Sequence, residues 1–326
     1  MALPALETLR AASPGSRITV AATPSVAPMF EEETSAGADE VIMIPDRRRE
    51  RSVLSLGKFD AAIVLPNSFR SAWALKRAGI RERWGFSAGG RGFLLTRAVP
   101  RPSAPIHQSA YYAALIAALG FEGTASSPRV RVRDETARRA DTLLAKHGVT
   151  SSSVIVGFAP GAAYGHAKRW PPSRVAEVIN RVTTERRATA VLVGAAGDRE
   201  AGREIESALP FGVSVVNLIG RTDLRQLAGV LARCSAFLSN DSGAMHLAAA
   251  VGAPVTAIFG PTDERVTSPI GDHDVLLHDV FCRPCMLRDC PIDHRCMKRI
   301  TADDVFNALS ARLEAPAAAP VDAARN

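Results

Sequence analysis

The feature that most constrains the fold is one unit of strand, polar turn, helix and strand. An apolar run, Ser235–Leu238, leads into the polar turn Ser239–Gly243, and an alanine-rich helical segment and a second apolar run, Pro254–Phe259, follow. This is the pattern of a βαβ unit, in which two parallel strands flank a helix. Because the first N–H groups of such a helix have no partner within the helix, the turn predicts a phosphate-binding site. The alternative interpretation is an ordinary helix cap by Asp241 or Ser242.

The same alternation repeats along most of the chain. Short apolar runs predict buried strands, and amphipathic patterns between them predict helices. Apolar strands separated by helices indicate parallel sheets with helices on both faces, and their ligands bind beyond the carboxyl ends of the strands. The predicted fold class is therefore α/β, with doubly wound parallel sheets. The expected strands cover residues 17–22, 40–44, 60–65, 153–158, 189–193, 214–218, 236–238 and 254–259, and the expected helices cover 68–78, 107–119, 134–147, 172–184, 199–209 and 224–234.

The length of 326 residues suits two domains of ordinary size. Residues 124–132 are polar, and after one more helical pattern the chain reaches the polar segment Thr150–Ser153. We therefore expect a first domain over 1–150 and a second over 151–313. The Ala/Pro-rich residues 314–326 are expected to form a flexible tail.

Composition and charge narrow the class of function. No apolar run approaches the roughly 20 residues that cross a bilayer, and the N-terminus lacks the pattern of a secretion signal, so a cytoplasmic protein is expected. The net charge is +7, without a basic stripe interleaved with aromatic residues, so nucleic acid is not an expected partner. A basic surface suits a phosphorylated substrate or an anionic membrane face, although an ordinary solvated surface explains the same charges.

A second polar segment follows the apolar run that ends at Phe158. It contains Gly161 and Ala162, and later the cationic pair Lys168 and Arg169 just before the next helix. Positive charge beside free N–H groups indicates a second phosphate-binding element. Taken alone, an exposed loop is the alternative.

Several motifs occur in a fixed order. They are Pro-Gly-Ala-x-x-Gly-x-Ala-Lys-Arg-Trp-Pro from Pro160, Val-Gly-Ala-x-x-Asp from Val193, Asn-Asp-Ser-Gly-x-Met-His from Asn240 and Phe-Gly-Pro-Thr from Phe259, and the first half adds Leu65–Ala72. Together they resemble the heptosyltransferases of glycosyltransferase family 9, which build the inner core of lipopolysaccharide. The resemblance covers nearly the whole chain and implies two Rossmann-like domains in the GT-B arrangement.

The resemblance also implies inverting transfer of heptose from ADP-heptose, with the donor bound by the second domain. Lys168 would neutralise charge on the departing diphosphate and Asp241 would bind heptose hydroxyls, so these two are the expected catalytic residues. Ser242 and Gly243 would hold a phosphate, and His246, one helical turn further on, would face the same ligand. The other expected substrate-binding residues are Gly161, Ala162, Gly194, Gly220 and Asn240. For Gly194 and Gly220, an ordinary turn is the alternative interpretation.

The partners implied are ADP-heptose and the lipopolysaccharide core acceptor at the cytoplasmic face of the inner membrane, with no metal in the chemistry. Membrane contact is expected from the lipid-linked acceptor, because the sequence shows no amphipathic anchor. Several cations of the first half could meet acceptor phosphates or carboxylates, with solvated surface as the alternative for each. They are Arg70, Lys76, Arg81, Arg83 and Arg91.

One part of the family pattern is missing. The family's general base is an Asp in a Gly-Asp-x-x-Met-type loop after the first strand, whereas the segment from Met1 resembles the helix after that loop. The first strand and its base are therefore expected upstream of Met1, either because the sequence starts at an internal Met or because the chain is a true truncation. This chain is expected to bind the donor but transfer poorly. The alternatives are another family 9 sugar transferase, a non-catalytic sugar-nucleotide-binding protein, or an interaction module built on the cysteines.

Most of the cysteines fall within one short segment. The leading Cys-x-x-Cys has metal-ligand spacing, and thiolates could hold a structural zinc ion or an iron–sulfur cluster. Reduced thiols are the main alternative, and disulfides are less expected in a cytoplasmic protein. Cys234, outside the cluster, is expected in the core. The clustered residues are Cys282, Cys285, Cys290 and Cys296.

Overall fold

The computed structural model describes residues 1–46, 48–123 and 126–314. The chain divides into two compact units, Met1–Arg131 and Val132–Asn326. The tail expected over 314–326 lies, apart from Glu314, outside the described residues. No helix in the described part of the chain is both long enough and apolar enough to span a bilayer.

The division between the units lies about a helix earlier than the boundary expected near residue 150. The reason is α5 (Asp134–Ala145), which packs on α8 (Leu224–Ala232) of the second unit. Gly229 of α8 permits this approach, because a Cβ there would lie 2.7 Å from the Cβ of Ala140. An amphipathic helix has the same pattern in either domain, so only this contact assigns α5 to the second unit.

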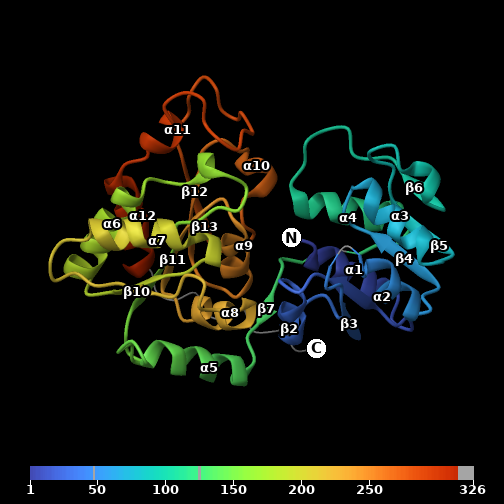
Figure 1. Ribbon diagram of the computed structural model, residues 1–326, viewed down its shortest axis with the longest axis horizontal. Helices are drawn as coiled ribbons and strands as arrows, with labels where there is room; N and C mark the ends of the chain where they lie inside the picture. The colour runs from blue at the N-terminus through green and yellow to red at the C-terminus, as the bar shows by residue number, and fades with distance from the viewer. Residues whose placement is uncertain (47, 124–125, 315–326) are drawn as a thin grey trace. The chain divides into compact units, whose positions relative to one another are not determined.

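The second unit is built on a six-stranded parallel sheet with the order β10-β9-β8-β11-β12-β13 (Figure 1). Its strand order reverses between the neighbours β8 and β11, as in a doubly wound dinucleotide-binding fold. Every residue of β8, β11 and β12 is buried, as expected for parallel strands covered on both faces. The α/β, doubly wound prediction is confirmed. The strands are β8 (Ile155–Ala159), β9 (Thr189–Leu192), β10 (Val216–Asn217), β11 (Ala236–Asn240), β12 (Val255–Phe259) and β13 (His273–Leu277).

Two groups of helices complete this unit. Helix α6 packs against both α7 and α12, and α8 contacts both α5 and α9. The apolar side chains of α6 and α12 share one core cluster with Trp170 and the sheet. The remaining helical elements are η3 (His166–Lys168), α6 (Pro172–Arg186), η4 (Ala196–Asp198), α7 (Arg199–Ala208), α9 (Gly243–Ala250), α10 (Glu264–Thr267), α11 (Arg295–Lys298) and α12 (Ala302–Glu314).

The parallel strands of the first unit form two separate sheets. One joins β1 (Thr19–Ala22) to β3 (Glu40–Met43), and the other has the order β4-β5-β6. In the described residues, β1 and β4 (Ala61–Val64) each pair along one edge only, and Val64 is the one buried residue in these two strands. This sheet structure is less buried than that of the second unit. The other elements are α1 (Leu3–Ala12), η1 (Ala27–Glu31), β2 (Glu33–Thr34), α2 (Glu50–Leu56), α3 (Phe69–Arg77), β5 (Glu82–Phe86), η2 (Gly92–Leu94), β6 (Arg97–Val99), α4 (Gln108–Ala118) and β7 (Val130–Arg131).

Helix α3 begins and ends where its sequence dictates. The Ser68 side chain caps it by accepting a hydrogen bond from the backbone N–H of Ser71 at 3.2 Å. Its buried face consists of Ser71, Ala72, Ala74 and Leu75. After the helix, Gly79 adopts φ +79°, a left-handed conformation that favours glycine and stops the helix. The opposite face of α3 is therefore left to solvent.

Arg91 is a core residue rather than a surface cation for an acceptor. Its side chain is fully buried, and burial lowers the pKa of its guanidinium. The guanidinium donates to the carbonyl of Phe86 at 3.0 Å, to that of Ser68 at 3.2 Å, and to that of Pro66. The expectation that Arg91 meets acceptor anions is wrong, because its hydrogen bonds bind it to the loop before α3.

Candidate functional site

The loops that follow β8 and β11 bring Lys168 and Asp241 together. Lys168 Nζ lies 2.5 Å from Asp241 Oδ2, and the side chains are only 12% and 6% exposed. Thr262, after β12, donates its hydroxyl to the same carboxylate oxygen at 2.7 Å. The two charged residues are 73 positions apart and meet because β8 and β11 are neighbours at the reversal of strand order, where such sheets bind ligands.

Helix α9 begins at this pair without a side-chain cap. Its N-cap residue, Ser242, makes no side-chain capping hydrogen bond. Asp241 is occupied by Lys168 and Thr262, so the capping alternative is wrong. A Cβ on Gly243 would have no neighbour within 4 Å, so the space beside this glycine is open. Backbone N–H groups beside a lysine form a seat for an anion. His246 lies half-buried on the same helix.

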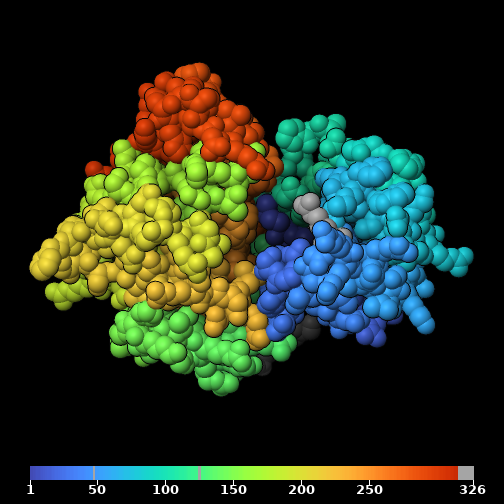
Figure 2. Space-filling view, viewed as in Figure 1, coloured from blue at the N-terminus to red at the C-terminus, as the bar shows by residue number. Residues whose placement is uncertain are grey.

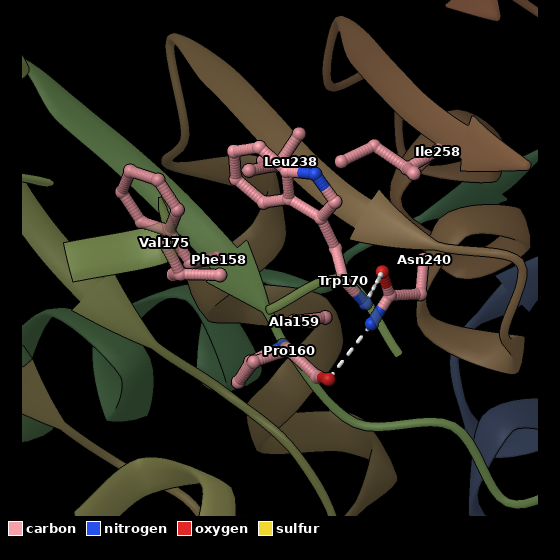
Figure 3. A pocket seen from close by; sticks show the side chains of 8 residues that line it. All are labelled: Phe158, Ala159, Pro160, Trp170, Val175, Leu238, Asn240 and Ile258. Carbon is pink, nitrogen blue, oxygen red and sulfur yellow. Dashed lines mark hydrogen bonds between the residues drawn. The ribbon is translucent and has the colours of Figure 1, made fainter. Parts of the chain in front are cut away.

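Asn240 shapes the loop that carries Lys168. It is buried, and Figure 3 shows its amide between Pro160 and Trp170. Its Nδ2 donates to the carbonyl of Pro160 at 2.7 Å, and its Oδ1 accepts from the backbone N–H of Trp170 at 3.2 Å. The amide therefore ties both ends of the β8 loop to β11, which makes Asn240 a positioning residue rather than a residue that faces open space.

The loops after β8 and β10 both contact the loop after β9, which contains Asp198. A Cβ on Gly161 would lie 2.1 Å from the carboxyl carbon of Asp198, and one on Gly194 would lie 3.0 Å from its Oδ2. Gly220 donates its N–H to the carbonyl of Gly194 at 2.9 Å. Ala162 is buried nearby in the chain. The structure thus brings Gly161, Gly194 and Gly220 together at the ends of three strands, and glycine at 161 is required by close packing.

The cysteine-rich segment, residues 282–296, rests on both site loops. Figure 2 shows its orange-red atoms above the yellow-green atoms of the β8 loop. The backbone N–H of Ala167 donates to the carbonyl of Arg288 at 2.9 Å, and that of Met286 donates to the carbonyl of Pro261 at 2.9 Å. The segment therefore positions the loop of Lys168 and the loop that leads to Thr262.

Tyr164 is a site residue that the sequence reasoning missed. Its hydroxyl donates to the carbonyl of Met286 at 2.9 Å. Lys168 Nζ lies 4.8 Å from the centre of its ring and the guanidinium of Arg288 lies 5.1 Å from it, both within the range of cation–π attraction. The only signal in the sequence is an aromatic residue inside a glycine-containing loop.

All four clustered cysteines are free thiols that line one small cavity. Burial raises the pKa of the Cys296 thiol, and the neighbouring cysteines raise it further. In the ranges that the structure describes, no group of three or more His, Cys, Asp or Glu side chains is placed to hold a metal ion. The four thiols therefore lie close together around this cavity. Cys234 is a core residue, and burial raises the pKa of its thiol to about 12.

Comparison with known proteins identifies the family to which this chain belongs. Residues 47–295 match the model of glycosyltransferase family 9 (heptosyltransferase). The chain belongs to glycosyltransferase family 9. The predicted membership is thereby confirmed, and a matched stretch that includes both site loops makes the pair of Lys168 and Asp241 part of the family 9 region.

Among family 9 relatives, lipopolysaccharide heptosyltransferase 2 of Escherichia coli K12 is 35% identical over 238 residues, which are 70% of this chain and 67% of that protein. Lipooligosaccharide heptosyltransferase 2 of Haemophilus influenzae is 36% identical over 235 residues, 68% of this chain and 66% of that protein. The alignments span about two thirds of the relatives' length. The structure of E. coli ADP-heptose lipopolysaccharide heptosyltransferase II is similar with a TM-score of 0.81 and 29% identity, covering 96% of this chain and 94% of that one. The GT-B fold class is confirmed by this likeness.

Proposed function

We propose that this family 9 protein transfers heptose from ADP-heptose to the inner core of lipopolysaccharide, with inversion at the anomeric carbon, as a heptosyltransferase II. The observation that carries the proposal is the buried pair of Lys168 and Asp241 beside the uncapped start of α9. A cation, a carboxylate and free helix N–H groups suit a diphosphate joined to a sugar.

Donor binding begins with an exchange of partners at Lys168. The diphosphate accepts hydrogen bonds from the Lys168 ammonium and from the N–H groups of Ser242 and Gly243. Asp241, which holds Lys168 at 2.5 Å before binding, is then released to accept hydrogen bonds from heptose hydroxyls. Tyr164 keeps the ammonium close to the loop during this exchange, because its ring lies 4.8 Å away.

In the transfer step, an acceptor hydroxyl attacks the anomeric carbon from the face opposite ADP. The bond between that carbon and the diphosphate oxygen breaks, and ADP leaves with the bonding electrons. Lys168 and the positive end of α9 stabilise the charge that grows on the leaving group. The acceptor proton passes to a general base. None of the residues that the structure describes is assigned that role.

The cysteine-rich segment has a structural part in this proposal. No cofactor takes part in the transfer. The segment holds the site loops through backbone hydrogen bonds, and its thiols are either reduced or arranged around a zinc ion or an iron–sulfur cluster. Elemental analysis of the purified protein decides between these states. The protein is proposed to act at the cytoplasmic face of the inner membrane, peripheral to it, because the acceptor is lipid-linked.

Calorimetry and a transfer assay test the proposal together. We expect ADP-heptose to bind more tightly than ADP, and UDP-glucose not to bind. Transfer to a heptosylated core acceptor should follow. Equal binding of UDP-glucose would point to another family 9 sugar transferase. Donor binding with no transfer under any condition would point to a sugar-nucleotide-binding protein.

A further inference from the structure

Helix α3 of the first unit presents an exposed cluster of aromatic rings. Phe69 and Trp73 are four residues apart and therefore share one face of the helix; they are 46% and 41% exposed, and their rings stack with centroids 6.4 Å apart. Phe93 of η2 is 70% exposed, and its ring centroid lies 6.0 Å from that of Phe69. These three residues form a contiguous surface, which we call the aromatic patch.

The side chains of the aromatic patch are not needed to complete the hydrophobic core. The opposite face of α3 already supplies the core with Ala72, Ala74 and Leu75, which are all buried. Single exposed apolar side chains are common, whereas contiguous exposed clusters mark interaction sites. Tryptophan is also enriched at membrane interfaces, where its ring contacts lipid and its N–H stays solvated.

Two cations continue the same helix face. Lys76 and Arg77 follow Trp73 by three and four residues, and both are exposed. The guanidinium of Arg77 lies 6.0 Å from the centre of the Trp73 ring. Across the described ranges, neither cation forms an ion pair with a carboxylate, whereas Arg70 is paired with Glu50. The outer face of α3 thus combines apolar rings with uncompensated positive charge.

We propose that this face of α3 docks on an anionic lipid surface. The rings enter the interface between headgroups and acyl chains, and Lys76 and Arg77 contact lipid phosphates. Charge complementarity favours this occupant over an apolar protein groove, which would have to desolvate two unpaired cations. The inference rests on the proposed function, in which the acceptor is lipid-linked. It adds that the outer face of α3 is the surface that contacts the membrane.

Vesicle sedimentation with the full chain tests the docking directly. We expect binding to phosphatidylcholine vesicles that contain phosphatidylglycerol, and weak binding to phosphatidylcholine alone. Trp73→Ser with Phe93→Ser should weaken binding by roughly tenfold or more, because two aromatic rings no longer bury apolar area at the interface. Lys76→Gln with Arg77→Gln should weaken it by roughly fivefold per charge, since each basic residue near an anionic surface contributes a similar factor. The matched control is Leu56→Ser with Phe211→Ser, which removes two apolar side chains that are 81% and 108% exposed outside the patch.

The proposal is overturned if the wild-type chain does not bind anionic vesicles, or if the control variant loses as much binding as the patch variants. Melting curves of each variant establish that it folds. A soluble, deacylated acceptor separates the two proposals: the Trp73→Ser, Phe93→Ser variant should transfer to it as the wild type does. A raised KM for that acceptor in this variant would place saccharide, not lipid, on the patch and would refute the docking. Intact vesicle docking without any transfer would refute the proposed function alone.

Discussion

Replacing Lys168 by Met tests whether the buried pair is both a structural element and the donor site. The substitution keeps an unbranched chain of similar length but removes the ammonium that lies 2.5 Å from Asp241 Oδ2. The carboxylate, 6% exposed, then retains the Thr262 hydroxyl at 2.7 Å but no cation. Breaking a buried ion pair in this way typically costs about 3–5 kcal/mol. For a unit of this size, each kcal/mol shifts the melting temperature by about 2–4 °C.

At the lower end of this energy range, a loss of about 3 kcal/mol, we expect the melting temperature of the second unit to fall by roughly 6–12 °C. A double-mutant cycle with Asp241→Asn isolates the pair. The double variant leaves no charge buried, so it should recover most of the lost stability. Its affinity for ADP should remain low, because Lys168 supplies the phosphate contact.

Differential scanning calorimetry gives the stability of the four proteins in the cycle, and isothermal titration with ADP gives their affinities. Additive losses of stability in the double variant would refute the pair as an energetic unit. Wild-type affinity for ADP in Lys168→Met would refute the phosphate role while leaving the pair intact. The two readouts therefore test the structure and the function of this pair separately.

Other expectations follow from single contacts. Tyr164→Leu should raise the KM for ADP-heptose by roughly two- to fivefold, which corresponds to the loss of an exposed cation–π contact. Tyr164→Phe keeps the ring and should change this KM less. Equal effects of the two substitutions would assign the role to the hydroxyl. Iodoacetamide at neutral pH should spare Cys234, since a pKa of about 12 leaves almost no thiolate, and mass spectrometry showing labelling as fast as at Cys285 would contradict its burial. Hydrogen exchange should be faster in β1 and β4 than in β8 and β11, because the first pair is less buried and bonded along one edge in the described residues; equal protection would argue against this difference.

Most of the second unit's sheet could be predicted from sequence because its strands are short, uninterrupted apolar runs. The run Pro254–Phe259 became β12 within one residue. Strands β5 and β13 were missed for the converse reason. They begin Glu-Arg and His-Asp, so charged residues interrupt the apolar pattern that signals a buried strand.

The site was predictable in its residue types but not in its pairings. Strand-end loops identified Lys168 and Asp241, whereas their direct contact depends on β8 and β11 being neighbours, which composition does not reveal. Asn240 is a polar residue at a strand end, and only its bonds to Pro160 and Trp170 show that it serves the loop. The position of the Tyr164 ring depends on a hydrogen bond to the carbonyl of Met286, which is 122 residues away in the chain.

The aromatic patch shows a similar limit of periodicity. The pattern of α3 predicts a helix with one apolar face, and small residues such as Ala72 and Ala74 make that face. Large rings on the other face contradict the usual rule that large apolar side chains point inward. Sequence reasoning found no anchor for that reason, because it takes exposed fractions to show that Phe69 and Trp73 point to solvent.

The central claim is that the diphosphate of the donor replaces Asp241 as the partner of Lys168 at the start of α9. A crystal structure of this chain with ADP-heptose measures this directly. We predict diphosphate oxygens within hydrogen-bond distance of Lys168 Nζ and of the N–H groups of Ser242 and Gly243, with Asp241 turned to the heptose. Donor density elsewhere, or a Lys168–Asp241 pair that remains closed beside a bound donor, would contradict the account.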